Sequence, residues 1–116
     1  MQDFMLLFRN ETGDGRYSAS PEQMQAAMPK WQAWLGELAQ QGKFVGTQPL
    51  LYEGKTVRPG GSVTDGPFAE IKELVVGYVL CKADDEAEAI TFAQRCPIVD
   101  YPGGSVEVRA IAPFDV

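Results

Sequence analysis

The chain has 116 residues, a formal net charge of −6 at pH 7 and no histidine. That length predicts a single domain with one modest core, and a content of 45% hydrophobic and 22% charged residues is typical of a globular protein rather than a disordered one. The acidic excess argues against a broad surface for nucleic acid or for an anionic membrane, because both need clustered Lys and Arg. A local basic pocket for a small anion is compatible with it.

Nothing in the sequence predicts a membrane span or a secretory leader. The most apolar run, residues 74–81, is far shorter than the roughly 20 residues that cross a bilayer. The first residues lack the basic stretch that opens a secretory signal. Cys81 and Cys96 are too few for a disulfide framework or a metal cluster, so we expect two buried free thiols in a cytoplasmic protein.

The first part of the chain predicts a strand followed by a long helix. Residues 4–8 are all apolar, which favours a strand that is apolar on both faces. Ser20 is the expected N-cap of the helix, with Pro21 as its first residue and Gln23 as the capping-box partner. Gly42 ends the helix. Apolar residues at helical spacing predict the face that packs on a sheet: Met24, Ala27, Met28, Trp31, Trp34, Leu35 and Leu38.

Three β segments follow the helix. Residues 43–52 are expected to form a strand, in which Gly46 and Pro49 indicate a sheet edge or a bulge. Turn residues at both ends make residues 55–63 a small hairpin-like excursion. Residues 72–82 have the strongest strand pattern in the chain.

A second helix and a last strand complete the order of elements. Asp84 or Asp85 is the expected N-cap of this helix, and Pro97 ends it. Its expected apolar face consists of Ala89, Ile90, Ala93 and Cys96. Residues 105–111 alternate as a strand does, with Val106, Val108 and Ala110 on one side and Glu107, Arg109 and Ile111 on the other.

The order β-α-β-(hairpin)-β-α-β predicts an α+β fold of the split βαβ, ferredoxin-like kind. In that topology residues 4–8 and 74–81 are the central strands, and both are apolar on both faces. Two helices cover only one face of the sheet, so the other face needs a partner. Packing it on the same face of a second copy would give a homodimer that encloses a partly polar cleft, with Glu107 and Arg109 between the sheets or at the rim.

The lack of histidine narrows the possible chemistry. A Ser-His-Asp triad, a Cys-His pair and a His-rich metal centre are ruled out within one chain. No phosphate-binding loop or dinucleotide fingerprint is recognisable either. We therefore expect no metal site and no cofactor. Any catalysis would depend on carboxylates, Lys72, arginine or tyrosine, unless a cofactor were bound.

Residues 64–73, directly before the most apolar strand, hold the first candidate site. Asp65 begins the sequence Asp-Gly-Pro-Phe, which has two interpretations. In a turn, Asp65 would cap backbone amides while Gly and Pro set the course of the chain. In a site, Asp65 would join Glu70 and Lys72 at the mouth of a pocket, because Glu70 and Lys72 point to one face of an extended strand. Such a lysine can hold an anion, although Glu70 and Lys72 could equally form a weak surface pair.

Two arginines and a tyrosine are further candidates for ligand binding. Arg9 ends the first strand and Arg109 lies on the last, so both could approach one end of the sheet and bind a carboxylate or phosphate. The alternative is pairing with Glu107 or another acid across the strands. Tyr17 could offer its phenol to a ligand, whereas Tyr78, in mid-strand, is more typical of a core or dimer-interface residue.

Five short segments carry a family pattern: residues 4–7, Ser-Pro-Glu at 20–22, Val-Thr-Asp-Gly-Pro-Phe-Ala-Glu at 63–70, Gly-Tyr at 77–78 and Gly-Ser-Val-Glu-Val-Arg at 104–109. With them the chain resembles the YCII-related, or DGPF-domain, proteins over nearly its whole length. The resemblance implies a bacterial protein with a dimeric α+β barrel fold. Many members are associated with extracytoplasmic-function sigma factors, which implies a regulatory context.

The resemblance implies less about activity. Some YCII-like relatives resemble small lyases or dehalogenating enzymes that use a His-Asp pair in the dimer cleft, and this chain has no histidine to supply one. Asp65 alone matches a family site residue. Two hypotheses follow: a protein that binds a small polar or anionic molecule in a dimer cleft, or a non-catalytic interaction or regulatory module that acts with a sigma factor.

Overall fold

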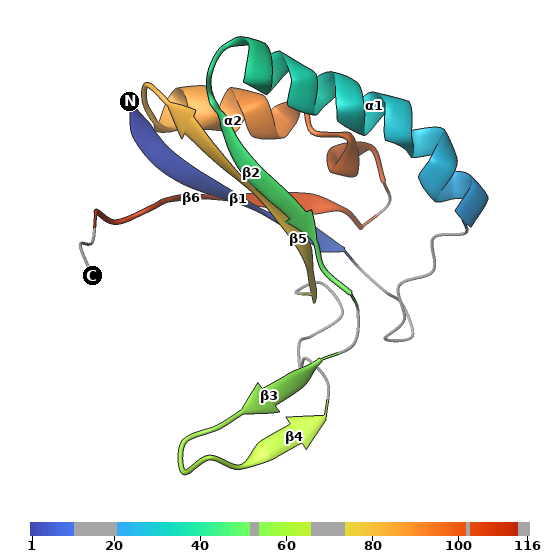
Figure 1. The fold of residues 1–116 in the computed structure, drawn as a ribbon, viewed down its shortest axis with the longest axis vertical. Coiled ribbons are helices and arrows are strands. Elements are labelled where there is room, and N and C mark those ends of the chain that lie inside the picture. The colour runs from blue at the N-terminus through green and yellow to red at the C-terminus, as the bar shows by residue number, and fades with distance from the viewer. Residues whose placement is uncertain (11–20, 52–53, 66–73, 102, 114–116) are drawn as a thin grey trace.

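The computed structural model describes residues 1–10, 21–51, 54–65, 74–101 and 103–113. These residues form an α+β fold with a four-stranded antiparallel sheet, two α-helices and a separate two-stranded hairpin (Figure 1). The elements in chain order are β1 (Gln2–Asn10), α1 (Pro21–Gln40), β2 (Phe44–Pro49), β3 (Lys55–Val57), β4 (Val63–Asp65), β5 (Leu74–Ala83), α2 (Glu86–Gln94), the 3-10 helix η2 (Pro97–Asp100) and β6 (Ser105–Ala110).

The main sheet has the strand order β2-β5-β1-β6, so β1 and β5 are central, as the sequence predicts for a ferredoxin-like arrangement. Along both central strands buried side chains alternate with partly exposed ones. The buried set, which includes Leu6 and Val79, faces the two helices. Both helices lie on this one side of the sheet, and no described helix covers the opposite side, called the open face below (Figure 1).

The helix ends follow the capping signals of the sequence. At the end of α1, Gly42 has a φ of +70° and its N–H donates to the carbonyl of Ala39, while the N–H of Lys43 donates to that of Leu38. This pair of bonds is a Schellman motif, in which glycine avoids the steric cost of a left-handed backbone. At the start of α2, Asp85 is the N-cap and accepts from the N–H of Glu88 at 2.8 Å. The expected N-cap of α1, Ser20, lies outside the described residues.

The core is organised around two tryptophans of α1. Phe8, Trp31 and Trp34 form an aromatic cluster, with Trp31 and Trp34 in an edge-to-face arrangement at 5.9 Å. The Trp34 Nε1–H donates to the carbonyl of Phe92, and the Trp31 Nε1–H donates to the hydroxyl of Tyr101, each at 3.0 Å. Thus α1 is tied by hydrogen bonds to both α2 and the segment after η2.

Two expected core residues are exposed instead. Met28 is 51% exposed, and the first turns of α1 extend past the end of the sheet (Figure 1). Ile90 is 39% exposed, and Phe92 takes its place in the core, so that Ala89, Phe92 and Ala93 form the buried face of α2. The side chain of Met24 lies outside the described part of the structure.

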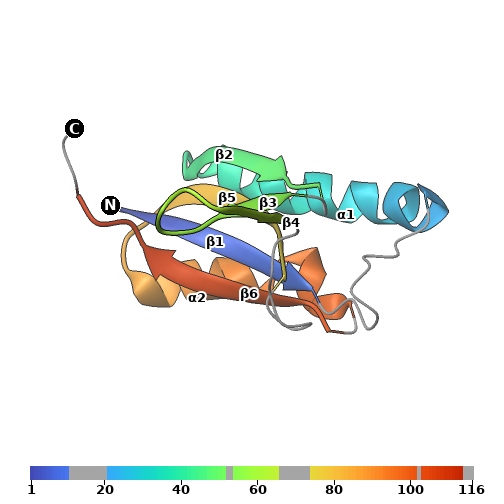
Figure 2. The ribbon, with the colours of Figure 1, turned by 90° about the horizontal axis from the view of Figure 1, so that it is seen from below.

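The region between β2 and β5 also follows the sequence prediction. β2 is an edge strand with a bulge between Phe44 and Gly46. β3 and β4 form a hairpin of their own, called the β3–β4 hairpin below, whose tight turn is closed by bonds from the N–H of Arg58 to the carbonyl of Ser62 and from that of Gly61 to Arg58. In Figures 1 and 2 this hairpin stands on the side of the sheet away from the helices.

Within the described ranges, neither α-helix combines the length and the hydropathy that a membrane crossing requires.

Candidate functional site

The open face of the sheet has an apolar centre formed by β1 and β5. The pairing register puts Leu7 opposite Tyr78, and it puts Met5 opposite Leu80. All four side chains are partly exposed, whereas the residues between them are buried under the helices. Tyr78 therefore lies on the open face and not in the core between sheet and helices.

A charged cluster borders this apolar centre on β1 and β6, and it consists of Arg9, Glu107 and Arg109. One carboxylate oxygen of Glu107 lies 3.5 Å from the Arg9 guanidinium, and the other lies 3.8 Å from that of Arg109. Glu107 is directly opposite Leu7 in the register, and Arg109 is opposite Met5. The cluster is therefore part of the open face.

The most exposed cation of the cluster is Arg109, which Glu107 contacts only at 3.8 Å. The side chain of Arg9 is 25% exposed, that of Glu107 is 41% exposed and that of Arg109 is 69% exposed. Both distances are longer than those of strong charge-assisted hydrogen bonds, so the pairs are loose and solvent reaches Arg109. The sequence alternative in which the arginines pair with Glu107 is thus confirmed, and the pairing leaves donors of Arg109 facing solvent.

The remaining predicted site residues lie elsewhere or outside the described part. Asp65 ends β4 and forms an ion pair with Lys55 across the β3–β4 hairpin. Their side chains are 89% and 65% exposed, so the pair contributes little to stability. The structure does not place Asp65 beside the charged cluster. Glu70, Lys72 and Tyr17 lie outside the described residues, and so does the turn that follows Asp65. Lys55 was not anticipated as a partner, although the hairpin register, once known, pairs the two directly.

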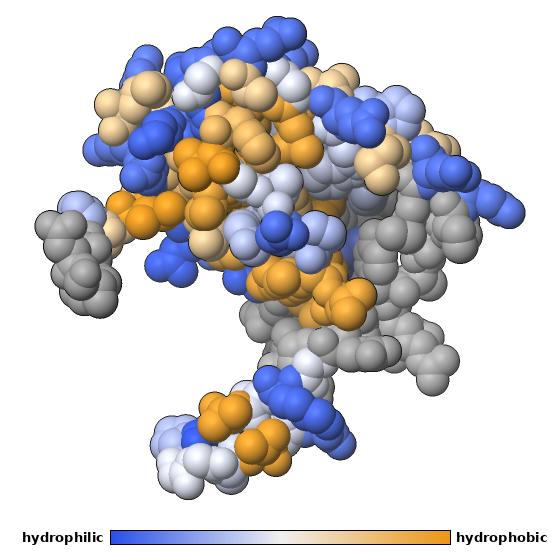
Figure 3. Space-filling model, in the orientation of Figure 1, coloured by the Kyte–Doolittle hydropathy of each residue, from blue (hydrophilic) through white to orange (hydrophobic). Residues whose placement is uncertain are grey.

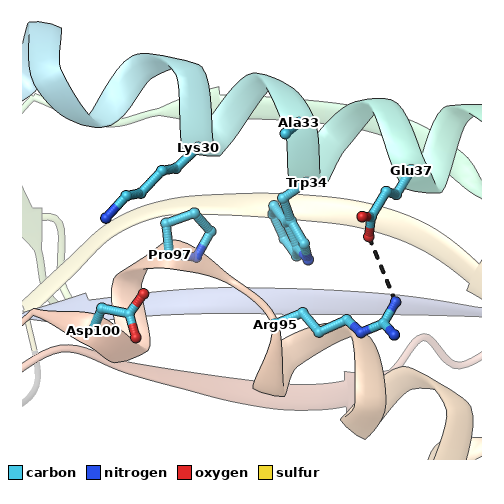
Figure 4. Close-up of a pocket in the computed structure, with 7 residues that line it drawn as sticks. All are labelled: Lys30, Ala33, Trp34, Glu37, Arg95, Pro97 and Asp100. Carbon is cyan, nitrogen blue, oxygen red and sulfur yellow. Dashed lines mark ion pairs between the residues drawn. The ribbon is translucent and has the colours of Figure 1, made fainter.

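A groove of about 520 Å³ lies on the opposite side of the molecule, between α1 and the segment formed by α2 and η2 (Figure 4). Its lining residues are Lys30, Ala33, Trp34, Glu37, Arg95, Pro97 and Asp100. Glu37 and Arg95 form an ion pair across it at 3.5 Å. Two cationic and two anionic side chains balance each other there, so the groove has less attraction for an anion than the charged cluster of the open face.

Lys43 and Glu88 form a partly buried ion pair at 2.6 Å, between the residue before β2 and the first turn of α2. The hydrogen bond to Glu88 raises the pKa of Lys43, and the hydrogen bond from Lys43 lowers the pKa of Glu88. Glu88 also accepts from the backbone N–H of Asp84 at 2.9 Å. The pair therefore caps a helix and joins two elements, which is a structural role.

Neither cysteine is a candidate nucleophile. Cys81 and Cys96 are buried free thiols, as the sequence predicts. Burial raises the pKa of Cys81 to about 11 and that of Cys96 to about 12. Both are protonated at neutral pH, and the thiolate is the reactive form. Among the residues that the structure describes, no three carboxylates or thiols gather closely enough to hold a metal ion.

Comparison with known proteins identifies the family of this chain. The sequence profile of the YCII-related domain matches residues 4–115. An uncharacterized protein, R00369 of Rhizobium meliloti (strain 1021), is 40% identical over 52 residues, which are 45% of this chain and 42% of that protein. The chain therefore matches less than half of the length of this relative.

Among solved structures the chain is similar to the 5-chloro-2-hydroxyhydroquinone dehydrochlorinase TftG from Burkholderia phenoliruptrix AC1100, in complex with 2,5-dihydroxybenzoquinone. The two are 17% identical, the match covers 90% of each chain, and the TM-score is 0.43. A likeness at this level says nothing about what this chain binds.

Proposed function

This chain belongs to the YCII-related domain family, and we propose that it binds a small polar or anionic molecule on the open face of its sheet, in a cleft that a second copy closes. The observation that carries the proposal is the charged cluster of Arg9, Glu107 and Arg109 beside an apolar centre.

The open face supports a second copy as the cover. Met5, Leu7, Tyr78 and Leu80 form an apolar surface that no described helix covers. Antiparallel sheets can leave one face to water, but such a face then carries polar residues, and these four positions do not. Packing of two such faces about a two-fold axis buries both and gives the dimeric α+β barrel that the family pattern predicts.

The charge of the cluster favours an anion. The chain as a whole has a net charge of −6, so an exposed guanidinium such as that of Arg109 on the open face stands out against an acidic protein. Arginine presents its donors in a planar fork that matches carboxylate and phosphate. Enclosure between two sheets would lower the local dielectric constant and strengthen each such contact.

The apolar residues next to the cluster define the rest of the ligand. Leu7 and Met5 lie directly opposite Glu107 and Arg109, so a molecule held by a guanidinium would rest on these side chains. The site therefore fits a small molecule with one anionic group and an apolar or aromatic body. The association with a sigma factor stays a prediction from the family pattern. No contact among the described residues favours it.

The experiment titrates the protein with inorganic phosphate, succinate and benzoate. Calorimetry and thermal unfolding measure the binding. Replacement Arg109→Ala should weaken binding of the best of these anions about tenfold or more, because it removes a charge-assisted contact. Arg95→Ala is the matched control: its side chain is 70% exposed and paired with Glu37 at 3.5 Å, but it lies on the helix side. If neither variant changes the affinity for these anions, the proposal is contradicted. Light scattering that shows a monomer at micromolar concentration would also contradict it.

A further inference from the structure

The β3–β4 hairpin is a small sheet that projects from the body on its open-face side. In Figure 1 the helices, the main sheet and the hairpin follow one another in that order, and in Figure 2 the hairpin lies in front of the sheet with the helices behind it. No helix or strand of the described body packs extensively on the hairpin. A radius of gyration of 15.4 Å agrees with a projection, because a compact chain of this length has about 13 Å.

The hairpin has contacts of its own but too few for independent stability. Each strand has 3 residues, and an isolated two-stranded hairpin is marginal in water at best. Its internal bonds include the one from the hydroxyl of Thr64 to the carbonyl of Thr56. The element therefore gains stability if something else packs on it.

One face of the hairpin presents unpaired apolar surface. Val57 and Val63 lie directly opposite each other and are 68% and 61% exposed. Lys55 and Asp65 lie on the same face, because alternate residues of a strand share a face. Figure 3 shows this hydrophobic area of the hairpin separated from the hydrophobic surface of the body. Two adjacent exposed valines form a small apolar patch, which is less favourable in contact with water than when it is buried.

The area of the main sheet indicates what the hairpin contacts. Strands of 6 to 10 residues, at about 3.3 Å per residue and about 4.8 Å apart, offer a flat face of about 500 Å². A stable interface buries about 800 Å² of accessible surface per partner. The sheet face alone is therefore smaller than the surface that each partner of a stable dimer typically buries. The hairpin and the residues that lead into it, Leu50 and Leu51 at 46% and 87% exposure, supply further apolar surface.

We propose that the β3–β4 hairpin is a dimerisation arm, which packs Val57 and Val63 against a second copy of this chain seated on the open face. The inference rests on the proposed function, since that function requires the second copy. Because Lys55 and Asp65 share the face of the valines, their ion pair would lie at the contact with the second copy.

The test replaces both valines by threonine, as Val57→Thr with Val63→Thr, and measures self-association by sedimentation velocity over a range of concentrations. Threonine keeps the β-branched shape and the preference for strands, so the hairpin itself is retained. The dissociation constant of the dimer should rise at least about tenfold, because two valines per arm, and four per dimer, lose an apolar contact. Val99→Thr, at a 44% exposed valine of η2 on the helix side, should leave the constant unchanged.

The outcomes separate this inference from the proposed function. A dimer whose dissociation constant is the same in the double variant and the wild type overturns the arm and leaves the anion site standing. A dimer that the double variant weakens, but that binds none of the tested anions, supports the arm and contradicts the proposed function. A wild-type chain that is monomeric at all concentrations overturns both.

Discussion

The replacement Trp34→Phe should destabilise the fold by about 2–3 kcal/mol. Trp34 is 4% exposed and its Nε1–H donates to the carbonyl of Phe92 at 3.0 Å. Loss of that bond costs about 1 kcal/mol, and not more, because the same carbonyl also accepts from the backbone N–H of Arg95. The smaller ring leaves a cavity in the packing between α1 and α2, which costs about 1–2 kcal/mol.

Thermal unfolding measures this loss, and Trp31 supplies the matched control. For 116 residues the unfolding entropy at the midpoint is about 0.24 kcal/mol/K, so each kcal/mol lowers the Tm by about 4 °C and Trp34→Phe by about 8–12 °C. Trp31 belongs to the same aromatic cluster, but it is only partly buried and donates to the hydroxyl of Tyr101, which water can satisfy. Trp31→Phe should therefore lower the Tm by less than about 6 °C, and an equal or larger effect than that of Trp34→Phe would refute this account of the core.

Two further predictions concern backbone packing and pH. A Cβ at Gly104 would collide with the carbonyl oxygen of Ile98, so Gly104→Ala should cost about 1–3 kcal/mol or more in thermal unfolding; Gly46→Ala, where nothing lies within 4 Å, is the control, and equal losses would contradict the reasoning. Burial raises the pKa of Cys81 to about 11 and of Cys96 to about 12 from 9.0, so above about pH 9 the unfolded chain releases protons that the folded chain keeps. The free energy of unfolding in urea should therefore fall as the pH rises above about 9, and less steeply when both cysteines are alanine; identical slopes would show that burial of the thiols has no part in it.

The succession of helices and strands could be predicted because its signals are local. A few neighbouring residues suffice to predict that α1 ends at Gly42, whose φ is +70°, and that Asp85 caps α2. β1 and β5 could be predicted as central strands because their residues are apolar on both faces. Only strands in the middle of a sheet are covered on both faces and therefore require apolar residues on both. Where the helix prediction failed, at Met28, the cause is not local: it is how far α1 is placed along the sheet, whose end its first turns pass.

The charged cluster could be foreseen only as alternatives, because it depends on strand register. Register shifts occur between Phe8 and Arg9 in the pairing of β1 with β5, and no sequence signal gave their position. The pairing of β1 with β6 then decides that Glu107 lies between two arginines and beside Leu7. The same limit applies to Lys55 and Asp65, whose contact is a consequence of hairpin register.

The chemistry that the described residues offer is electrostatic rather than nucleophilic. The chain has no histidine, and its two thiols are protonated at neutral pH because they are buried. What the open face presents instead is the guanidinium of Arg109, which is 69% exposed and held only loosely by Glu107. A fixed positive charge can bind and orient an anion without taking part in a proton transfer. Binding is therefore the activity to test first, and Arg109 is the residue through which to test it.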